Sequence, residues 1–210
     1  MSSMFSHAIS FNQQLNSWDV SNVFSMENMF SNASNFDQDL SSWNVSEVNE
    51  IGSMFYEALN FNGDLSDWDL SNATDISGMF ANAYNFNGDV SSWNVSMVEN
   101  MAFLFSGCEN FNQDISNWNV SNVTDMTGMF ESALVFDQNL STWDVSNVYN
   151  MSSLFENAAS YNQDLYSWDV TGTELMSNMF LNANSFNQDV SNWDISVSYT
   201  HLRAHETFAN

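Results

Sequence analysis

The stretch Phe111–Phe130, FNQDISNWNVSNVTDMTGMF, decides the fold because close variants of it occur along nearly the whole chain. Its tryptophan, Trp118, belongs to a column of tryptophans that recur every 25 residues. The members of this column are Trp18, Trp43, Trp68, Trp93, Trp118, Trp143, Trp168 and Trp193. Two further aromatic columns, through Phe105 and Phe111, keep the same spacing. A fixed period of this length is typical of stacked repeat proteins, so we predict that the tryptophans are structural.

The spacing of apolar residues changes within one unit. Trp18 and Val20 alternate with polar neighbours, which is typical of a half-buried strand over residues 15–20. The apolar residues that follow are spaced as on one face of an amphipathic helix over residues 23–33. They are Val23, Met26, Met29, Phe30 and Ala33. We therefore predict an α/β repeat solenoid with one short parallel strand and one short helix in each 25-residue unit.

The charge balance narrows the range of partners. One basic residue stands against 26 acidic residues, which gives a formal net charge of -25. Such a surface repels phosphate backbones and anionic lipid headgroups. No apolar run approaches the roughly 20 residues that a membrane-spanning helix needs. We expect no nucleic-acid partner and no direct membrane insertion of this segment.

Cys108, the single cysteine, stands in a column that is otherwise filled by alanines. This position predicts a small buried thiol. One cysteine forms neither an internal disulfide nor a multi-cysteine metal site. The recurring methionines, such as Met101 and Met126, are assigned to core packing rather than to a cofactor.

The repeat register defines one array, residues 1–196, of about eight units. The first unit starts mid-repeat, because Met1 and Phe5 occupy columns from the middle of later units. Residues 197–210 leave every column, contain Arg203, and are expected to be a non-repeat tail that is disordered or artefactual. The opening residues lack the basic and apolar regions of a signal peptide. Uncapped terminal repeats expose apolar edges, which predicts end-to-end self-association.

The skeleton Leu15-x-x-Trp18-x-Val20 is similar to the L-x-x-L-x-L core of leucine-rich repeats, which implies that the predicted solenoid is leucine-rich-repeat-like. The longer phrase F-N-x-D-L-S-x-W-D-V-S-N-V-x-x-M-x-x-M-F closely resembles the BspA-like leucine-rich-repeat surface proteins, whose repeats of this 25-residue type are abundant in mycoplasmas. Gly63 and Gly88 depart from the pattern, because most other units have Gln there. The resemblance implies a bacterial protein that is secreted or anchored at the cell surface, in a family associated with adhesion.

The residue after each tryptophan is Asp or Asn, which predicts an acidic stripe along the array. Its acidic members are Asp19, Asp69, Asp144, Asp169 and Asp194. Strands about 4.8 Å apart would bring Asp144, Asp169 and Asp194 close enough to repel one another. Calcium, a hard cation with a preference for carboxylate oxygens, could bridge these three residues. The alternative is a solvated stripe, since no unit has a chelating loop. We expect no other cofactor or metal.

Two more polar columns have structural interpretations. The acidic residues of the turn before each predicted strand are expected to accept backbone hydrogen bonds, as Asx residues do in turns. They are Asp39, Asp64, Asp89, Asp114, Asp164 and Asp189. An asparagine column through Asn62, Asn87 and Asn112 is expected to form a buried or half-buried ladder.

Large aromatic residues occur at some positions that are polar or small in other units. They are Phe24, Tyr56, Tyr84 and Tyr149. Such residues are candidate contact anchors for a partner. The alternative is a set of scattered apolar side chains of the kind that every protein surface carries.

Catalysis requires a unique pair of groups in different environments, and near-identical units do not offer one. His7, the one histidine of the array, has no positioned partner. We therefore expect no enzyme. The favoured function is a cell-surface or secreted module for adhesion or protein–protein interaction, with an extracellular protein or glycan as partner. The alternatives are a passive spacer or surface-layer element stabilised by calcium, and an intracellular scaffold.

Overall fold

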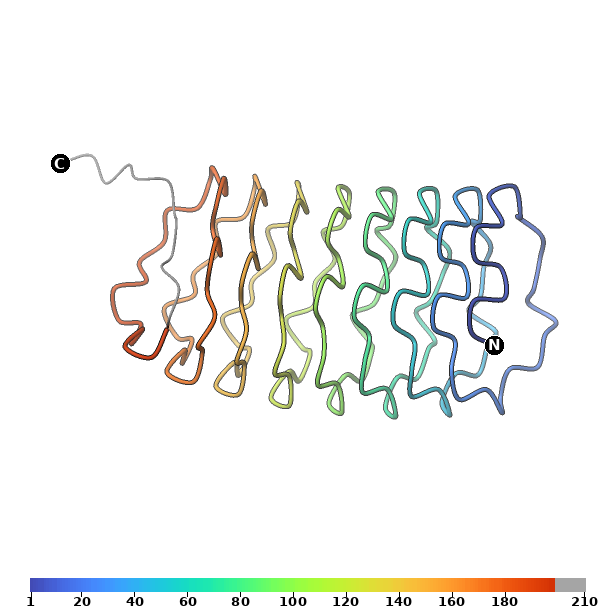
Figure 1. Cartoon of the computed structure of the whole chain (residues 1–210), viewed down its shortest axis with the longest axis horizontal. Helices are drawn as coiled ribbons and strands as arrows, with labels where there is room; N and C mark the ends of the chain where they lie inside the picture. The colour runs from blue at the N-terminus through green and yellow to red at the C-terminus, as the bar shows by residue number, and fades with distance from the viewer. Residues whose placement is uncertain (199–210) are drawn as a thin grey trace.

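The chain forms a row of similar coils stacked along one axis (Figure 1). The structure, a computed structural model, describes residues 1–198. Neighbouring coils are joined by isolated parallel bridges between residues 25 positions apart, from Ser25–Glu50 to Asn150–Leu175. The repeat period in the sequence is therefore the length of one coil. From residue 199 on, the predicted tail lies outside the described residues.

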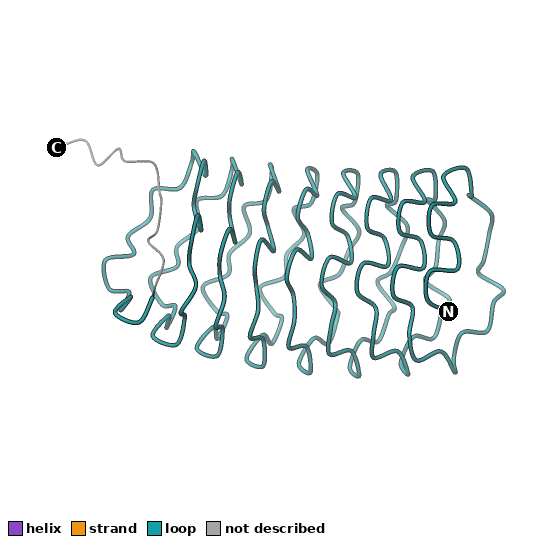
Figure 2. Cartoon of the chain, viewed as in Figure 1, coloured by secondary structure: helices purple, strands orange, loops and turns teal. Residues whose placement is uncertain are grey.

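Residues 1–198 contain no helix and no strand longer than a single bridge position (Figure 2). The predicted strand over residues 15–20 and the predicted helix over residues 23–33 are therefore wrong. The α/β, leucine-rich-repeat-like fold class is wrong with them. Each coil is instead a succession of turns, which in the coil that begins at Met101 lie at 102–107, 109–110, 116–117 and 121–122. Accordingly, the described part of the chain contains no helix that is long and apolar enough to cross a membrane.

Backbone hydrogen bonds explain why no helix forms. The N–H of Met26 donates to the carbonyl of Glu50 at 2.9 Å, and the N–H of Phe30 donates to Met54 at 2.8 Å. The N–H of Met29, between them, closes a turn on the carbonyl of Met26 at 3.1 Å. An α-helix would need these N–H groups to bond four residues back along the chain. Alternate N–H groups point along the stack instead, and each coil is bonded to the next.

Left-handed backbone positions block the helix as well. Asn28 and Asn32 have φ values of 55° and 60°, and their equivalents in the other coils are also positive. Each is the third residue of a four-residue turn, where a positive φ is required and Gly or Asn is favoured. Asn, Gly and Ser fill most of these two columns. This turn signal is present in the sequence but is weaker than the apolar spacing.

Four-residue turns also produce the spacing that imitates a helix. Cys108 N–H bonds to Phe105 O at 3.0 Å, and Phe111 N–H bonds to Cys108 O at 3.1 Å. The first and last residues of each turn point into the core, so buried residues follow at steps of three. Phe105, Cys108 and Phe111 are all fully buried. The buried thiol predicted for Cys108 is confirmed.

The tryptophans fasten each coil to the one before it. The indole Nε1–H of Trp118 donates to the carbonyl of Val90 at 3.0 Å, and that of Trp143 donates to Ile115 at 3.1 Å. The two indole rings stack with centroids 6.4 Å apart and planes 2° apart. From Trp43 onward the tryptophans are buried. Their predicted structural role is confirmed.

The two polar columns take the predicted structural roles. In the turn column, Asp39 accepts a hydrogen bond from the N–H of Ser41 at 2.8 Å, and its equivalents do the same. In the ladder column, Asn87 Oδ1 accepts a bond from the N–H of Asn112 in the next coil at 3.0 Å. Most of this ladder is exposed, so its predicted burial is wrong.

One core position carries an unpaired polar atom. Tyr161 stands in an aromatic column otherwise filled by phenylalanine and is fully buried. Its hydroxyl has no hydrogen-bond partner among the residues that the structure describes. Burial is the main cause that raises the pKa of this phenol, and the charge of Asp137 adds to it.

We predict that Tyr161→Phe raises the free energy of unfolding by about 1–3 kcal/mol, because it removes a buried donor that has no acceptor. Urea denaturation followed by circular dichroism measures the change. The matched control is Phe136→Tyr, which adds a hydroxyl in the same column one coil earlier and should lower the stability. A Tyr161→Phe protein that is less stable than the parent would contradict the prediction.

Candidate interaction site

The acidic stripe lies on the surface and takes part in turns. Asp19 Oδ1 accepts a hydrogen bond from the N–H of Ser21 at 3.1 Å. The other acidic members, Asp69, Asp144, Asp169 and Asp194, accept the equivalent bond at 3.0–3.1 Å. Asn44 makes the same bond to Ser46 at 3.2 Å. An Asx turn accepts either residue, which explains why Asp and Asn interchange in this column. A binding role for the stripe stays a prediction.

These turns lower the pKa of several carboxyl groups. The hydroxyl of Ser21 and then its N–H lower the pKa of Asp19, and Thr171 acts in the same way on Asp169. At Asp194 the N–H of Ser196 is the larger cause and its side chain the smaller. Hydrogen bonds to the charged carboxylate favour ionisation. The lowered pKa values therefore favour the ionised form of Asp19, Asp169 and Asp194.

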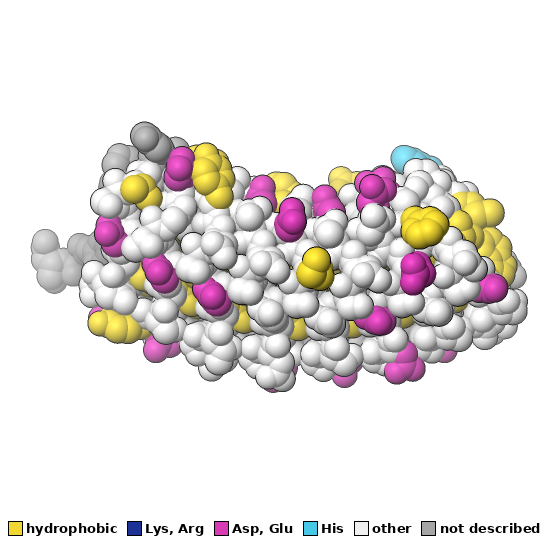
Figure 3. All heavy atoms as spheres, turned by 90° about the horizontal axis from the view of Figure 1, so that it is seen from below, with side chains coloured by type: hydrophobic (Ala, Val, Ile, Leu, Met, Phe, Trp, Pro, Cys, Tyr) yellow, Lys and Arg dark blue, Asp and Glu magenta, His cyan; other side chains and the backbone are white. Residues whose placement is uncertain are grey.

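Acidic side chains are spread along the array and do not gather at one point. Figure 3 shows them at intervals on one face, on which no Lys or Arg side chain is drawn. Within residues 1–198 there is no group of three or more His, Cys, Asp or Glu side chains that could hold a metal ion. Calcium at Asp144, Asp169 and Asp194 stays a prediction.

The predicted aromatic anchors do not form one patch. Phe24 and Tyr149 are 65% and 47% exposed and belong to the same column, five coils apart. Tyr56 and Tyr84 lie in adjacent coils, and Tyr84 is among the groups that raise the pKa of Tyr56. The structure brings only the second pair together, on the part of the array that contains a pocket.

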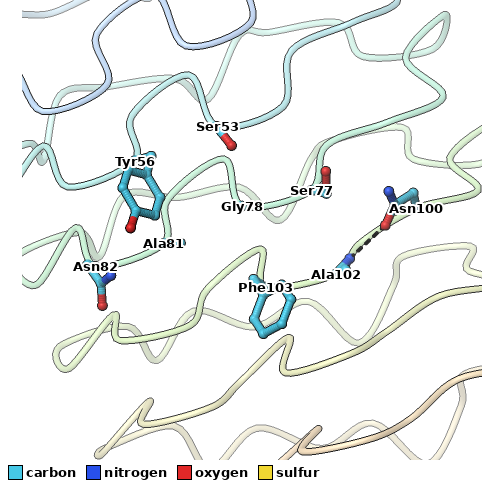
Figure 4. Close-up of a pocket in the computed structure, with 9 residues that line it drawn as sticks. All are labelled: Ser53, Tyr56, Ser77, Gly78, Ala81, Asn82, Asn100, Ala102 and Phe103. Carbon is cyan, nitrogen blue, oxygen red and sulfur yellow. Dashed lines mark hydrogen bonds between the residues drawn. The ribbon is translucent and has the colours of Figure 1, made fainter. Parts of the chain in front are cut away.

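An open pocket of about 390 Å³ crosses three successive coils. Tyr56 lies on one side and Phe103 on the other, with Gly78 and Ala81 of the middle coil between them (Figure 4). The complete lining is Ser53, Tyr56, Ser77, Gly78, Ala81, Asn82, Asn100, Ala102 and Phe103. Two aromatic side chains and several neutral polar groups therefore face one hollow.

The pocket exists because three coils depart from the repeat. Tyr56 and Phe103 are large residues in columns that hold mostly small or polar ones. The coil between them has Gly78 in the column of Phe103 and Ala81 in the column of Tyr56. Two large side chains thus flank two small ones, and the difference in size leaves a hollow.

Phe103 is the residue that sequence reasoning missed. Its φ is 57°, in the left-handed region that bulky residues rarely adopt. Its ring lies against the next coil, where a methyl group added at Gly128 would be 2.6 Å from Phe103 Cε1. The ring is 42% exposed. A phenylalanine in a column of Ser, Asn and Gly was the signal that could have identified it.

The floor of the pocket is fixed by hydrogen bonds. Gly78 N–H donates to the carbonyl of Ala102 at 2.7 Å. Ala102 N–H donates to Asn100 Oδ1 at 3.0 Å, and Asn100 Nδ2 donates to Asp75 Oδ2 at 3.0 Å. The carboxylate of Asp75 is therefore in direct contact with a residue that lines the hollow. Tyr56, on the opposite side, has a raised pKa, chiefly because its hydroxyl is hydrogen-bonded to Glu57.

The repeat pattern itself places the chain in a family. A model of Mycoplasma proteins of unknown function, DUF285, matches residues 1–89, 64–141 and 115–209. These matches cover nearly the whole chain. The protein therefore belongs to this family of Mycoplasma repeat proteins.

Other comparisons add little. No curated protein matches the chain. Among solved structures, a chain of the crystal structure of a TLR13–ssRNA13 complex is 10% identical, with a TM-score of 0.25. The match covers 84% of this chain and spans about a quarter, 25%, of the solved one. A likeness at this TM-score carries no argument about fold or ligand.

The Asx turns predict a pH dependence of stability. The lowered folded-state pKa values of Asp19, Asp169 and Asp194 mean that these groups stabilise the fold above their unfolded pKa. That contribution is lost as the pH falls through the folded pKa values. We expect the urea midpoint to decrease from about pH 5 to about pH 2, and to decrease less in the triple variant Asp19→Asn, Asp169→Asn, Asp194→Asn.

Asparagine keeps the hydrogen bond from the residue two positions on, as Asn44 does, but does not titrate. Glu131 acts in the opposite sense, because burial and then the charge of Glu156 raise its pKa. It is present in both proteins, so its effect cancels in the comparison. Equal slopes for parent and triple variant would contradict the assignment.

Proposed function

We propose that this protein is a non-enzymatic interaction module that acts in adhesion or protein–protein contact. The observation that carries the proposal is a set of exposed aromatic side chains at positions where several other coils have small or polar residues. Phe24, Tyr84, Phe103 and Tyr149 are 65%, 42%, 42% and 47% exposed. Aromatic side chains on a rigid support are typical anchors of binding surfaces.

A setting outside the cell forms part of the proposal. The support is the resemblance of the repeat to BspA-like surface proteins, which implies secretion or surface anchoring. The proposed partner is an extracellular protein or a glycan. Nucleic acid is not proposed, because a chain with 26 acidic residues and one basic residue repels a phosphate backbone.

The absence of enzymatic activity is likewise a proposal. Burial raises the pKa of the Cys108 thiol, which donates a hydrogen bond to the carbonyl of Phe80. A buried protonated thiol is a poor nucleophile. His7 is exposed and contacts the hydroxyl of Ser6 at 2.9 Å. These observations support binding over catalysis.

End-to-end association of the array is a second mode of contact within the same proposal. Met4 and Ile9 of the first coil are 56% and 60% exposed. Phe5 and Phe11 beside them are only partly buried. Apolar side chains are visible at this end of the molecule in Figure 3. Such a surface supports contact with the matching columns of another copy.

The first test is binding of the full chain to arrays of extracellular-matrix proteins and glycans. The comparison variant replaces four aromatics by residues found in their own columns: Phe24→Asn, Tyr56→Ser, Tyr84→Glu and Tyr149→Thr. We expect binding to weaken by at least about 10-fold, since loss of aromatic anchors costs more than about 1 kcal/mol each. Surface plasmon resonance measures the affinity.

The control is the thermal midpoint, which should stay close to that of the parent because all four positions are outside the core. Light scattering at each concentration separates self-association from binding to a partner. Equal affinity of parent and variant would contradict the proposal. If the parent bound none of the extracellular-matrix proteins and glycans, a passive spacer or surface-layer element would be favoured instead.

The spacer alternative includes stabilisation by calcium through Asp144, Asp169 and Asp194, which are consecutive in the stripe. Each of them uses Oδ1 in its own turn. We propose that the fold needs no calcium, and we expect thermal melts with millimolar calcium and with excess chelator to coincide. A cation that binds only the folded state would raise the midpoint. A rise of several degrees with calcium and not with magnesium would favour the alternative.

A further inference from the structure

An open pocket lies between Tyr56 and Phe103. In a stack of near-identical coils, most surface features recur in every coil. This pocket does not recur, because it needs the order of a large, a small and a large residue in three successive coils. A ligand that binds at one place on the array requires such a break in the repeat.

Its shape suits a small projecting group. The volume of about 390 Å³ lies near the lower end of the range of small-molecule pockets. The hollow is open on one side, and its floor is held by the bonds between Gly78, Ala102 and Asn100. A preformed floor lowers the entropy lost when a side chain is bound. One side chain of a partner fits this site better than a long apolar segment.

The electrostatic environment selects the charge of that group. Residues 1–198 contain no Lys or Arg, and the net charge of the whole chain is -25. Asp75 accepts a hydrogen bond from Asn100 of the pocket lining, and Glu57 directly follows Tyr56 in the chain. The pocket therefore lies in a strongly negative potential, which attracts cations and repels carboxylates and phosphates.

The lining provides the matching chemistry. The faces of Tyr56 and Phe103 are negative ends of ring quadrupoles and attract a cation placed over them. The pocket lining itself has no carboxylate, so a bound cation would be held by aromatic faces, amide oxygens and hydroxyls. Arg stacks on aromatic rings, and Lys places its ammonium group over them.

We propose that this pocket receives the positively charged side chain of a lysine or arginine from a basic segment of a partner protein. The inference rests on the proposed function and names the partner chemistry at one site. Phe103 serves as one wall, Tyr56 as the other, and Gly78 and Ala81 leave the space between them. Asp75 and Glu57 supply the field without contacting the ligand directly.

The strained backbone of Phe103 supports a binding role. A bulky residue is rarely found in the left-handed region, because its side chain crowds the backbone there. The same column holds asparagine at Asn28 and Asn178, a residue that tolerates this conformation. Phe103 therefore makes the fold less stable than asparagine would at the same position. Strained residues of this kind cluster at ligand sites.

The experiment titrates the isotopically labelled full chain with two short capped peptides, Gly-Gly-Lys-Gly-Gly and its Nε-acetyl-lysine counterpart. Amide chemical shifts of Gly78, Ala81 and Phe103 report on the pocket. We expect the lysine peptide to shift these signals and to bind at least about 10-fold more tightly than the neutral peptide, as loss of cation–π contacts predicts. Raising the salt from about 50 mM to about 500 mM should weaken binding by screening.

The test variant is Phe103→Asn, which introduces the residue that the same column holds at Asn28 and Asn178. We expect this variant to bind the lysine peptide about 10-fold more weakly than the parent. It should also melt at the same or a higher temperature, because the backbone strain is relieved. If Phe103 had a purely structural role, Phe103→Asn would leave lysine binding unchanged and would lower the melting temperature. The matched control is Phe24→Asn, which removes an exposed phenylalanine outside the pocket. It introduces asparagine, the residue that the next coil has at the equivalent position, Asn49. It should leave lysine binding within about twofold of the parent.

Each of the following results with the two peptides would overturn the proposal. The neutral peptide could bind as tightly as the lysine peptide, Phe103→Asn could leave binding unchanged, or the shifts could follow the acidic stripe instead of the pocket. If N-acetylglucosamine shifted the pocket signals and lysine did not, the cationic ligand would be wrong while the interaction module stood. The proposed function itself would fail if the parent chain and the variant without Phe24, Tyr56, Tyr84 and Tyr149 bound the same extracellular protein or glycan with equal affinity.

Discussion

The hydrogen bond from one coil to the next is the constraint on which the rest of the structure depends. Met26 N–H bonds to Glu50 O and Phe30 N–H bonds to Met54 O, and the same offset recurs along the stack. In this segment every second N–H is used in this way, and intervening N–H groups close turns on the residue three positions back, as Met29 does on Met26. The positive φ values at Asn28 and Asn32 allow those turns. The offset also aligns equal residues, so the indole of Trp118 reaches Val90 and the aromatic columns stack.

The sequence was informative where a property depends on the period alone. The burial of the tryptophans, the buried thiol of Cys108 and the turn role of Asp39 follow from columns and local chemistry, and the structure confirms them. The secondary structure could not be predicted from apolar spacing. Core residues such as Phe105, Cys108 and Phe111 recur at steps of three in successive turns as well as on a helix. Only the Asn, Gly and Ser content of the left-handed columns distinguishes the two.

The candidate site was found in part. Tyr56 and Tyr84 differ visibly from the other residues of their columns, and they lie in adjacent coils near the pocket. Phe24 and Tyr149 differ in the same way but do not line the pocket. Phe103 was missed although it is also an exception in its column, a phenylalanine among Ser, Asn and Gly; its left-handed backbone conformation is seen only in the structure. The space between Tyr56 and Phe103 depends on Gly78 and Ala81, so the site is a property of three coils considered together.

The uniform junction between coils has a consequence for how such proteins change over time. Each coil contacts its neighbours through the same indole–carbonyl bond and the same stacked rings, from Trp43 on Leu15 to Trp193 on Leu165. Gain or loss of a whole unit by gene duplication or deletion would rebuild an equivalent junction. An insertion of one residue would misalign the columns of every bond across it. Related chains can thus differ in length by whole repeats, and a binding pocket can be moved, lost or copied without disturbing the core.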